Sequence, residues 1–418
     1  MFGTSNTTYC KYIISKLEIF IPGEDTISAG KFNIGGMMIE KDFDNDIHPI
    51  IDLRLALTPI DIFNVLSHKN EVRFNIRLDK YTYSSEGDDY VSKDKVFDDI
   101  FAIYIDDNSV QLDKDLYNIT KSTTGTKTDL SDITEVYDFF LFKERDIDSA
   151  RTMVNTVIER GTMTDVLTYL LGVTDCTNVL MAPLDNHNTY ENIILYPTTL
   201  LNNINILNNS YGLYRHGSLL FFDITRTYLI NKRGDSDVYS RDEYTNVMIY
   251  IYKSTSTSIY QGGYNQDNKN RRYNINIVTS SIHMRTASPI TNVTTGTDVI
   301  LVDSISDSVD VITPTTDHRG ASTSKVVDKL TMSDMGNEFA ENEINARISE
   351  QNSIIEATFT GVDVGILSPN KRFTFAFEDT DIQNRIGGVY RLVKSVSTLS
   401  PKNSELNITS NCTFYKIK

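Results

Sequence analysis

The sequence predicts an α+β protein that is mainly β, in which β-rich segments lie on both sides of a helical segment. The 418-residue chain contains 23 Tyr and 19 Phe but no Trp, and it is rich in Thr, a composition that suits strands. Apolar residues alternate with period two near both ends and recur with a helical period between them. This length suggests two to four domains. We predict three, covering residues 1–145, 146–240 and 241–418.

The first segment is predicted to form strands. From Val72 to Leu78 apolar residues alternate strictly with polar ones, which indicates a half-buried strand. The same pattern predicts strands at 13–21, 97–105 and 137–142. One short helix is predicted from Pro59 to Leu66, because Thr58 is a good cap and Pro is tolerated in the first helical turn.

In the second segment the apolar period predicts three helices. A first helix face, capped by Ser149 and stopped by Gly161, consists of Ala150, Met153, Val154, Val157 and Ile158. A second helix, capped by Thr164 and closed by Gly172, has a face of Val166, Leu167, Leu170 and Leu171. A third begins at about Thr198 and stacks Leu200, Ile204, Leu207 and Tyr211.

The last segment returns to strands. They are predicted at 246–252, 273–279, 373–377, 389–398 and 406–417, with turns at 387–388 and 400–403. Residues 284–345 are rich in Ser, Thr and Asp and are predicted to be a loop-rich insertion. The insertion contains one strand-like run at 299–302. An acidic stretch near 338–350, which begins inside the insertion and ends beyond it, could form a helix.

Charge and cysteine content exclude several classes of protein. With 56 acidic and 40 basic residues the formal charge is −16, which disfavours a sequence-reading nucleic-acid binder but not a surface past which nucleic acid moves without adhering. The cysteines, Cys10, Cys176 and Cys412, are too few and too far apart for a disulfide scaffold or a thiolate zinc site. We identify no signal peptide and no apolar run long enough for a membrane span, so we predict a reducing, intracellular origin and no membrane insertion.

One acidic loop resembles the start of a calcium-binding loop. Asp42, Asp44 and Asp46 have the right spacing, but Ile47 stands where the sharp turn needs Gly and Leu53 where a bidentate Glu belongs. A solvated loop is therefore the favoured interpretation.

No catalytic residue, cofactor site or metal site is predicted. The sequence has no nucleophile elbow, no phosphate-binding glycine loop and no metal-ligand spacing among its six histidines, His48, His68, His187, His216, His283 and His318. Two acidic pairs, Asp98-Asp99 and Asp106-Asp107, could serve glycoside hydrolysis, although capping and solubilising loops is the favoured role.

A helix-to-hairpin passage follows the third predicted helix. Gly212 is placed to end that helix in the left-handed conformation, and 215–217 is predicted to turn the chain so that 219–223 runs back antiparallel to 213–214. His216 is therefore expected to be a turn residue. The structural signature of this passage consists of Tyr211, Gly212, Tyr214, Gly217, Phe221, Phe222 and Asp223.

This passage, LNNSYGLYRHGSLLFFD, and the C-terminal GGVYRLVKSVSTLSPKNSELNITSNCTFY resemble the baseplate hub proteins of contractile-tailed, T-even-like bacteriophages. The resemblance implies two tail-tube-like β-barrel domains with an α/β domain between them. It implies a non-enzymatic structural protein of the virion, located in the tail baseplate and synthesised in the host cytoplasm.

The resemblance also implies an assembly and its partners. Three copies would form a homotrimeric, pseudo-sixfold ring that adapts a hexameric tail tube to a trimeric spike. The expected partners are the tail-tube, central spike, tape-measure and baseplate wedge proteins, with DNA only as passing cargo. Two alternatives stay open: the hub-like domain of a siphophage tail-associated protein, and a polysaccharide-active enzyme or carbohydrate-binding β protein.

Overall fold

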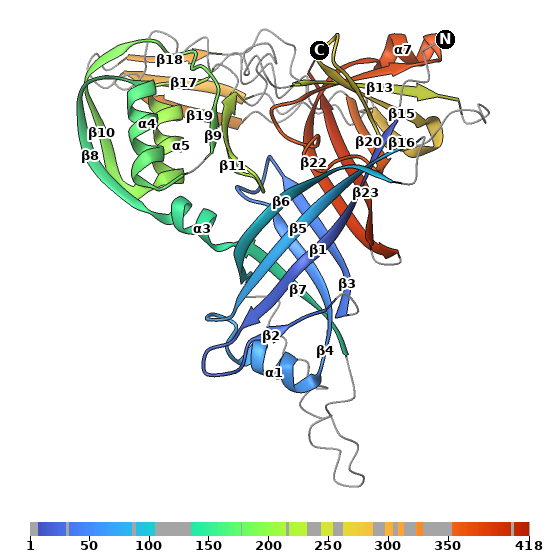
Figure 1. Ribbon diagram of the computed structural model, residues 1–418. Coiled ribbons are helices and arrows are strands. Elements are labelled where there is room, and N and C mark those ends of the chain that lie inside the picture. The colour runs from blue at the N-terminus through green and yellow to red at the C-terminus, as the bar shows by residue number, and fades with distance from the viewer. Residues whose placement is uncertain are drawn as a thin grey trace, which may run out of the picture.

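The computed structural model describes residues 7–30, 33–85, 89–104, 135–176, 178–214, 217–231, 244–253, 262–286, 297–303, 308–312, 323–328, 353–402 and 405–417. Strands dominate these ranges, as predicted (Figure 1). No helix within them is long and apolar enough to span a membrane.

Eight strands close into an antiparallel barrel in the lower part of Figure 1. Each is hydrogen-bonded to the next, and the last pairs with the first, in the order β1 (Thr8–Phe20), β5 (Arg73–Ser84), β6 (Tyr90–Ile103), β7 (Glu135–Lys143), β4 (Ile50–Leu57), β3 (Ile34–Asp42), β22 (Gly388–Lys402) and β23 (Glu405–Lys416). The short strand β2 (Ile27–Ser28) adds to β1, and the helix α1 (Pro59–Ser67) joins β4 to β5 with the predicted cap Thr58. The barrel therefore combines the N-terminal segment with the C-terminal hairpin.

The barrel interior is filled with side chains. On β5 the predicted alternation places Phe74, Ile76 and Leu78 inside, where none has any exposed surface. Phe74 packs against Phe139 of β7 with ring centroids 5.3 Å apart. An eight-stranded barrel is just wide enough for its side chains to fill, so this barrel is a core and not a pore.

The hairpin β22–β23 also belongs to a second, open sheet at the top of Figure 1. The order is β14 (Asn265–Asp267), β15 (Arg272–Val278), β13 (Asn246–Tyr252), β21 (Arg372–Phe377), β22, β23, β20 (Ser353–Thr360) and β16 (Ile282–Thr286). A 3-10 turn, η4 (Thr279–Ser281), precedes β16, and the helix α7 (Thr380–Ile386) precedes β22. Phe373 and Phe375 pack on Phe414 of β23, 4.9 and 5.1 Å between ring centroids.

A bulge in β22 marks the change from one sheet to the other. Before it, Arg391 and its neighbours pair with β21; after it, residues from Lys394 to Leu399 pair with β3. The register with β23 shifts between Leu392 and Lys394, and the carbonyl of Val393 accepts a hydrogen bond from the Phe43 amide at 2.9 Å. A bulge bends and twists a strand, which lets one hairpin serve two sheets.

The helical part of the chain, which we call the α/β unit, begins where β7 ends. It comprises α3 (Glu144–Arg151), β8 (Met153–Thr162), α4 (Met163–Val173), β9 (Val179–Met181), β10 (Thr189–Thr199), α5 (Leu200–Ser210), β11 (Ser218–Phe222) and β12 (Thr227–Asn231). Helices α4 and α5 cover one face of the β8–β10 ribbon, and β11, β12 and β9 form a separate small sheet (Figure 1). A capping box of Thr162 and Asp165 begins α4, so the cap is Thr162 and not the predicted Thr164.

The first predicted helix of this unit is wrong. Helix α3 ends at Arg151, and the chain from Met153 to Thr162 is a strand paired with β10 along its length. The apolar residues recur at helical spacing, but in the strand only Val154 and Ile158 pack against the core, whereas Met153 and Val157 lie on the other face and are 63% and 55% exposed. The β-branched residues of TMVNTVIERGT and the partner strand decide for β.

Two further predictions need correction. Strand β11 pairs with β12, which follows it, and not with residues 213–214, which form a bend. Part of the predicted loop-rich insertion forms a small sheet of β17 (Thr297–Asp303), β18 (Ser308–Ile312) and β19 (Thr323–Asp328). The acidic stretch near 338–350 lies outside the described residues.

Candidate functional site: a buried polar junction

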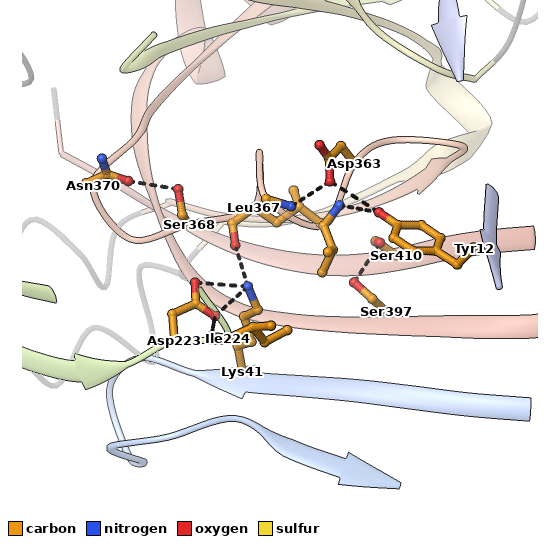
Figure 2. Close-up of polar contacts among 12 residues, drawn as sticks. Tyr12, Lys41, Asp223, Ile224, Asp363, Leu367, Ser368, Asn370, Ser397 and Ser410 are labelled. Atoms are coloured by element: carbon orange, nitrogen blue, oxygen red, sulfur yellow. Dashed lines mark hydrogen bonds and ion pairs between the residues drawn. The ribbon is translucent and has the colours of Figure 1, made fainter. Parts of the chain in front are cut away.

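A buried ion pair joins the barrel to the α/β unit. The Lys41 Nζ of β3 lies 2.8 Å from Asp223 Oδ1, just after β11, and 3.0 Å from Asp223 Oδ2 (Figure 2). Their side chains are 2% and 5% exposed. The Leu367 carbonyl accepts a weaker contact from Lys41 Nζ at 3.4 Å, and Asp223 Oδ1 accepts the Ile224 amide at 2.8 Å. We call Lys41, Asp223 and the Leu367 carbonyl the junction.

Apolar contacts surround the junction. The Phe43 ring, at the end of β3, meets the Phe221 ring edge-on with centroids 4.7 Å apart. The Phe222 amide donates to the Ile47 carbonyl at 2.7 Å. The end of β11 is thereby fixed to the β3–β4 loop next to the ion pair.

Residues 361–371, between β20 and β21, form a buried segment that we call the plug. Its apolar side chains, Val362, Val364, Ile366 and Leu367, are at most 3% exposed. Asp363 attaches the plug to the barrel. Tyr12 Oη donates to Asp363 Oδ1 at 3.2 Å (Figure 2), and Lys80 Nζ donates to Asp363 Oδ2 at 2.7 Å. Burial disfavours the charge on Lys80, but the Asp363 carboxylate outweighs it and raises the pKa of Lys80.

The acidic loop that resembles a calcium site holds a guanidinium group instead. The two carboxylate oxygens of Asp44 accept from Arg391 at 3.0 and 2.8 Å, a bidentate pair. Asp42 Oδ1 accepts the backbone amides of Asp44 and Asn45 and so closes the turn. Among the described residues there is no cluster of three or more metal-ligating side chains.

The acidic pair Asp98-Asp99 does not form a catalytic constellation. The two residues are neighbours on β6, so their side chains point to opposite faces of the sheet. Asp98 lies 3.8 Å from Arg77, and Asp99 lies 3.1 Å from Lys143. Asp106 and Asp107 lie outside the described residues.

A polar groove of about 420 Å³ lies over β16, β20, β22 and β23. Its lining includes His283, Glu356 and Lys394. Lys394 is engaged by Glu40, and Glu356 is the only carboxylate in the lining that the structure describes. Most glycosidases use two carboxyl groups, and the described lining of this groove supplies one.

The predicted signature residues hold the α/β unit together and link it to the barrel. Gly212 has φ +72° and ends α5, where Tyr211 is the C-cap residue. Tyr214 is buried and its hydroxyl donates to the carbonyls of Ala182 and Leu229, at 2.8 and 3.0 Å. Gly217 has φ +85° and precedes β11, which carries Phe221 and Phe222 to the junction. Arg215 and His216 lie outside the described residues.

The sequence alone did not reveal which residues form the buried ion pairs. Lys41 lies 182 positions from Asp223, and Asp363 lies 283 positions from Lys80. Charged residues are almost never fully buried unless paired, so a lysine inside the apolar run IGGMMIEKD gives a weak signal that a buried partner exists. It gives no indication of which residue that partner is.

Comparisons with known proteins agree with this architecture. A family model described as Bacteriophage PBS1 gene 109 protein matches residues 10–417. A tail protein from Neisseria meningitidis MC58 has a TM-score of 0.51 at 10% identity, covering 97% of this chain and 96% of that one. None of the curated protein sequences compared with the chain matches it.

Two more solved structures align with TM-scores too low to support an argument. The 43 kDa tail protein of prophage MuSo2 from Shewanella oneidensis gives 0.47 at 9% identity, covering 95% of this chain and 97% of that one. An E. coli component of the type VI secretion system, described as similar to the T4 bacteriophage tail proteins gp27 and gp5, gives 0.42 at 8% identity, covering 94% and 76%.

The predicted resemblance to phage baseplate proteins is confirmed at the level of family and fold. The mainly β fold is that of a tail protein over almost the full length of both chains. The family match extends from β1 to the end of β23 and so includes both sheets, the α/β unit and the plug. The chain belongs to the Bacteriophage PBS1 gene 109 protein family.

Proposed function

We propose that the protein is a structural component of a phage tail and forms the central hub of its baseplate. The observation that carries this proposal is the shared hairpin β22–β23, which joins the closed barrel and the second, open sheet within one chain. Three chains with two such units each would supply six positions around an axis, so one ring could meet a hexameric tube on one side and a trimeric spike on the other.

The side chains that fill the barrel limit where a DNA channel could lie. Because Phe74, Phe139 and their neighbours occupy the barrel axis, DNA could pass only through a lumen enclosed between chains. The formal charge of −16 suits such a lumen, since like charge keeps the phosphate backbone from adhering.

The proposed partners are those of a hub. They are two further copies of the chain, the tail-tube, central spike, tape-measure and baseplate wedge proteins, and DNA as passing cargo. The proposed location is the virion baseplate, after synthesis in the host cytoplasm. The division at 145 and 240 stays part of this proposal, with the qualification that the C-terminal hairpin pairs with the first segment.

A non-enzymatic role is favoured because the charged groups of the junction, of the plug contact and of the acidic loop neutralise one another. Lys41 is engaged by Asp223, Lys80 by Asp363, and Arg391 by Asp44. None of these carboxylates is left as an accessible acid or base, and the polar groove offers a single carboxylate. The arrangement is suited to holding parts of a chain together.

The mass of the purified protein in solution tests the proposal. We expect light scattering to give three times the 47.4 kDa chain mass and negative-stain images to show rings with a central hole. A glycan array and a polysaccharide hydrolysis assay, run on the same sample, address the alternative. A monomer that binds or cleaves glycans would overturn the hub proposal.

A further inference from the structure

A second contact between the α/β unit and the barrel lies at the start of α3. A small, partly open pocket of about 10 Å³ lies there, at the lower limit of the space that one water molecule needs. Its lining consists of Pro49, Ile51, Phe97, Phe101, Ile224, Asp99, Lys143 and Asp146. Most of these residues are apolar, so a charge placed there would be poorly hydrated.

The charged groups around this pocket do not balance. Lys143 of β7 faces the pocket and pairs with Asp99 of β6 at 3.1 Å. Glu144, next along the chain, pairs with Arg73, and Arg145 lies 3.6 Å from Asp175. Asp223, from the turn after β11, is engaged by Lys41. Asp146 of α3 has no hydrogen-bond or ion-pair partner in the part of the chain that the structure describes.

We propose that the α/β unit is docked on the barrel through a proton-dependent contact, in which Asp146 is seated as a neutral carboxylic acid and its ionisation loosens the contact around α3. The Lys41–Asp223 pair holds the unit on the other side of Ile224, so loosening is local and does not release the unit. This inference concerns the isolated chain and does not depend on the hub proposal.

The direction of the pH effect follows from the environment of Asp146. Burial raises the pKa of its carboxyl to about 7, with Asp99 and Asp223 adding to the rise while Lys143 and Arg145 oppose it. In an opened state the pKa returns toward its ordinary value of 3.8. The contact is therefore fully formed below the ordinary pKa and weakens as the pH rises through about 7.

A nearby histidine acts in the opposite direction. His48 contacts the Phe142 ring and the Pro49 carbonyl, and burial lowers the pKa of its imidazole. Its protonation at acid pH therefore opposes folding, so at this contact a loss of protection on acidification is assigned to His48 and a loss on alkalinisation to Asp146. A His48→Asn background separates the two.

Native-state hydrogen exchange at pH 5.5 and pH 8.5 tests the proposal, with rates corrected for intrinsic exchange at each pH. In the His48→Asn protein we expect the protection of the α3 and Ile224 amides to fall about tenfold or more at the higher pH. Amides of β5, in the barrel, should keep their protection. Adding Asp146→Asn should remove the pH dependence at α3.

The exposed neighbour Asp148 provides a matched control, and Asp148→Asn should leave the wild-type response unchanged. Flat protection at α3 in the parent protein, or an unchanged response after Asp146→Asn, would overturn the proposal. Should the Asp146 variant fail to fold, carboxyl-carbon NMR of the parent protein decides, because an Asp146 midpoint near 4 is incompatible with a neutral carboxyl.

Discussion

At the scale of single residues, the most consequential contact of the junction is the buried Lys41–Asp223 ion pair. Removing one partner of a buried pair leaves the other charge without compensation in a poorly hydrated site. We expect Lys41→Met to lower the free energy of unfolding by about 3–5 kcal/mol, measured by urea denaturation. Lys41→Met combined with Asp223→Leu should recover much of that loss, because no charge is then stranded.

The exposed pair Arg54–Asp138 is the control for this prediction. It has the better geometry, with two hydrogen bonds of 2.7 and 2.9 Å, but its side chains are 55% and 38% exposed. Water screens such a pair, so Arg54→Met should change stability far less than Lys41→Met. If the two substitutions lowered the free energy of unfolding equally, burial would not be what makes the Lys41–Asp223 pair important.

Only one partner of the buried ion pair, Asp223, was singled out from the sequence. Asp223 was part of the predicted signature, since it ends an unusual apolar run. Lys41, Asp363 and Arg391 gave no comparable signal, because their partners come from distant parts of the chain and only the closed barrel brings them together. Long-range pairing of this kind cannot be deduced from local pattern.

At the scale of elements, tight crossings between strands impose the strictest requirements. Gly263 has φ +71°, and a Cβ there would lie 2.3 Å from the Thr8 carbonyl oxygen. Its amide donates to the Thr360 carbonyl at 2.7 Å, which connects the start of β14 to the end of β20. Gly263→Ala therefore combines backbone strain with a clash against main chain.

We expect Gly263→Ala to lower the melting temperature well beyond Gly23→Ala. Gly23 has φ +81° but open space around it, so its substitution should cost only the conformational term of about 1 kcal/mol. For Gly263 we expect about 3 kcal/mol. Differential scanning calorimetry of both variants provides the comparison, and similar melting temperatures would contradict the steric argument.

Most of the elements with unambiguous periods were predictable, and β4 is an exception. The strict alternation in β5 and β21 and the face of α5 matched the structure within a few residues. Strand β8 was predicted as a helix because its apolar residues recur at helical spacing, and the strand leaves two of them, Met153 and Val157, exposed. Strand β4 was not predicted, although Ile51, Leu53, Leu55 and Leu57 alternate.

At the scale of the whole molecule, the barrel is discontinuous in sequence. Residues 7–143 supply six of its strands, and the hairpin 388–417 supplies the other two. Without the hairpin, β1 would lose its pairing at Lys11 and Tyr12 and β3 its pairing from Met37 to Asp42, so the barrel could not close.

We therefore expect residues 1–145 expressed alone to remain unfolded. The same segment joined by a flexible linker to 388–417 should give a cooperative thermal transition by circular dichroism. A folded 1–145 fragment would instead support a self-contained N-terminal domain. This closure could not be inferred from the sequence, since both strands of the hairpin looked like members of a separate C-terminal barrel.

The shared hairpin has a mechanical consequence. A pull that separates the two sheets along β22 and β23 acts parallel to the strands, so many ladder hydrogen bonds resist it together. A pull across the strands would break them one after another. The two sheets should therefore yield little when loaded end to end. The α/β unit should yield first, because the described contacts that attach it to the barrel are the junction, the Phe43–Phe221 and Phe222–Ile47 contacts beside it, and the short helix α3.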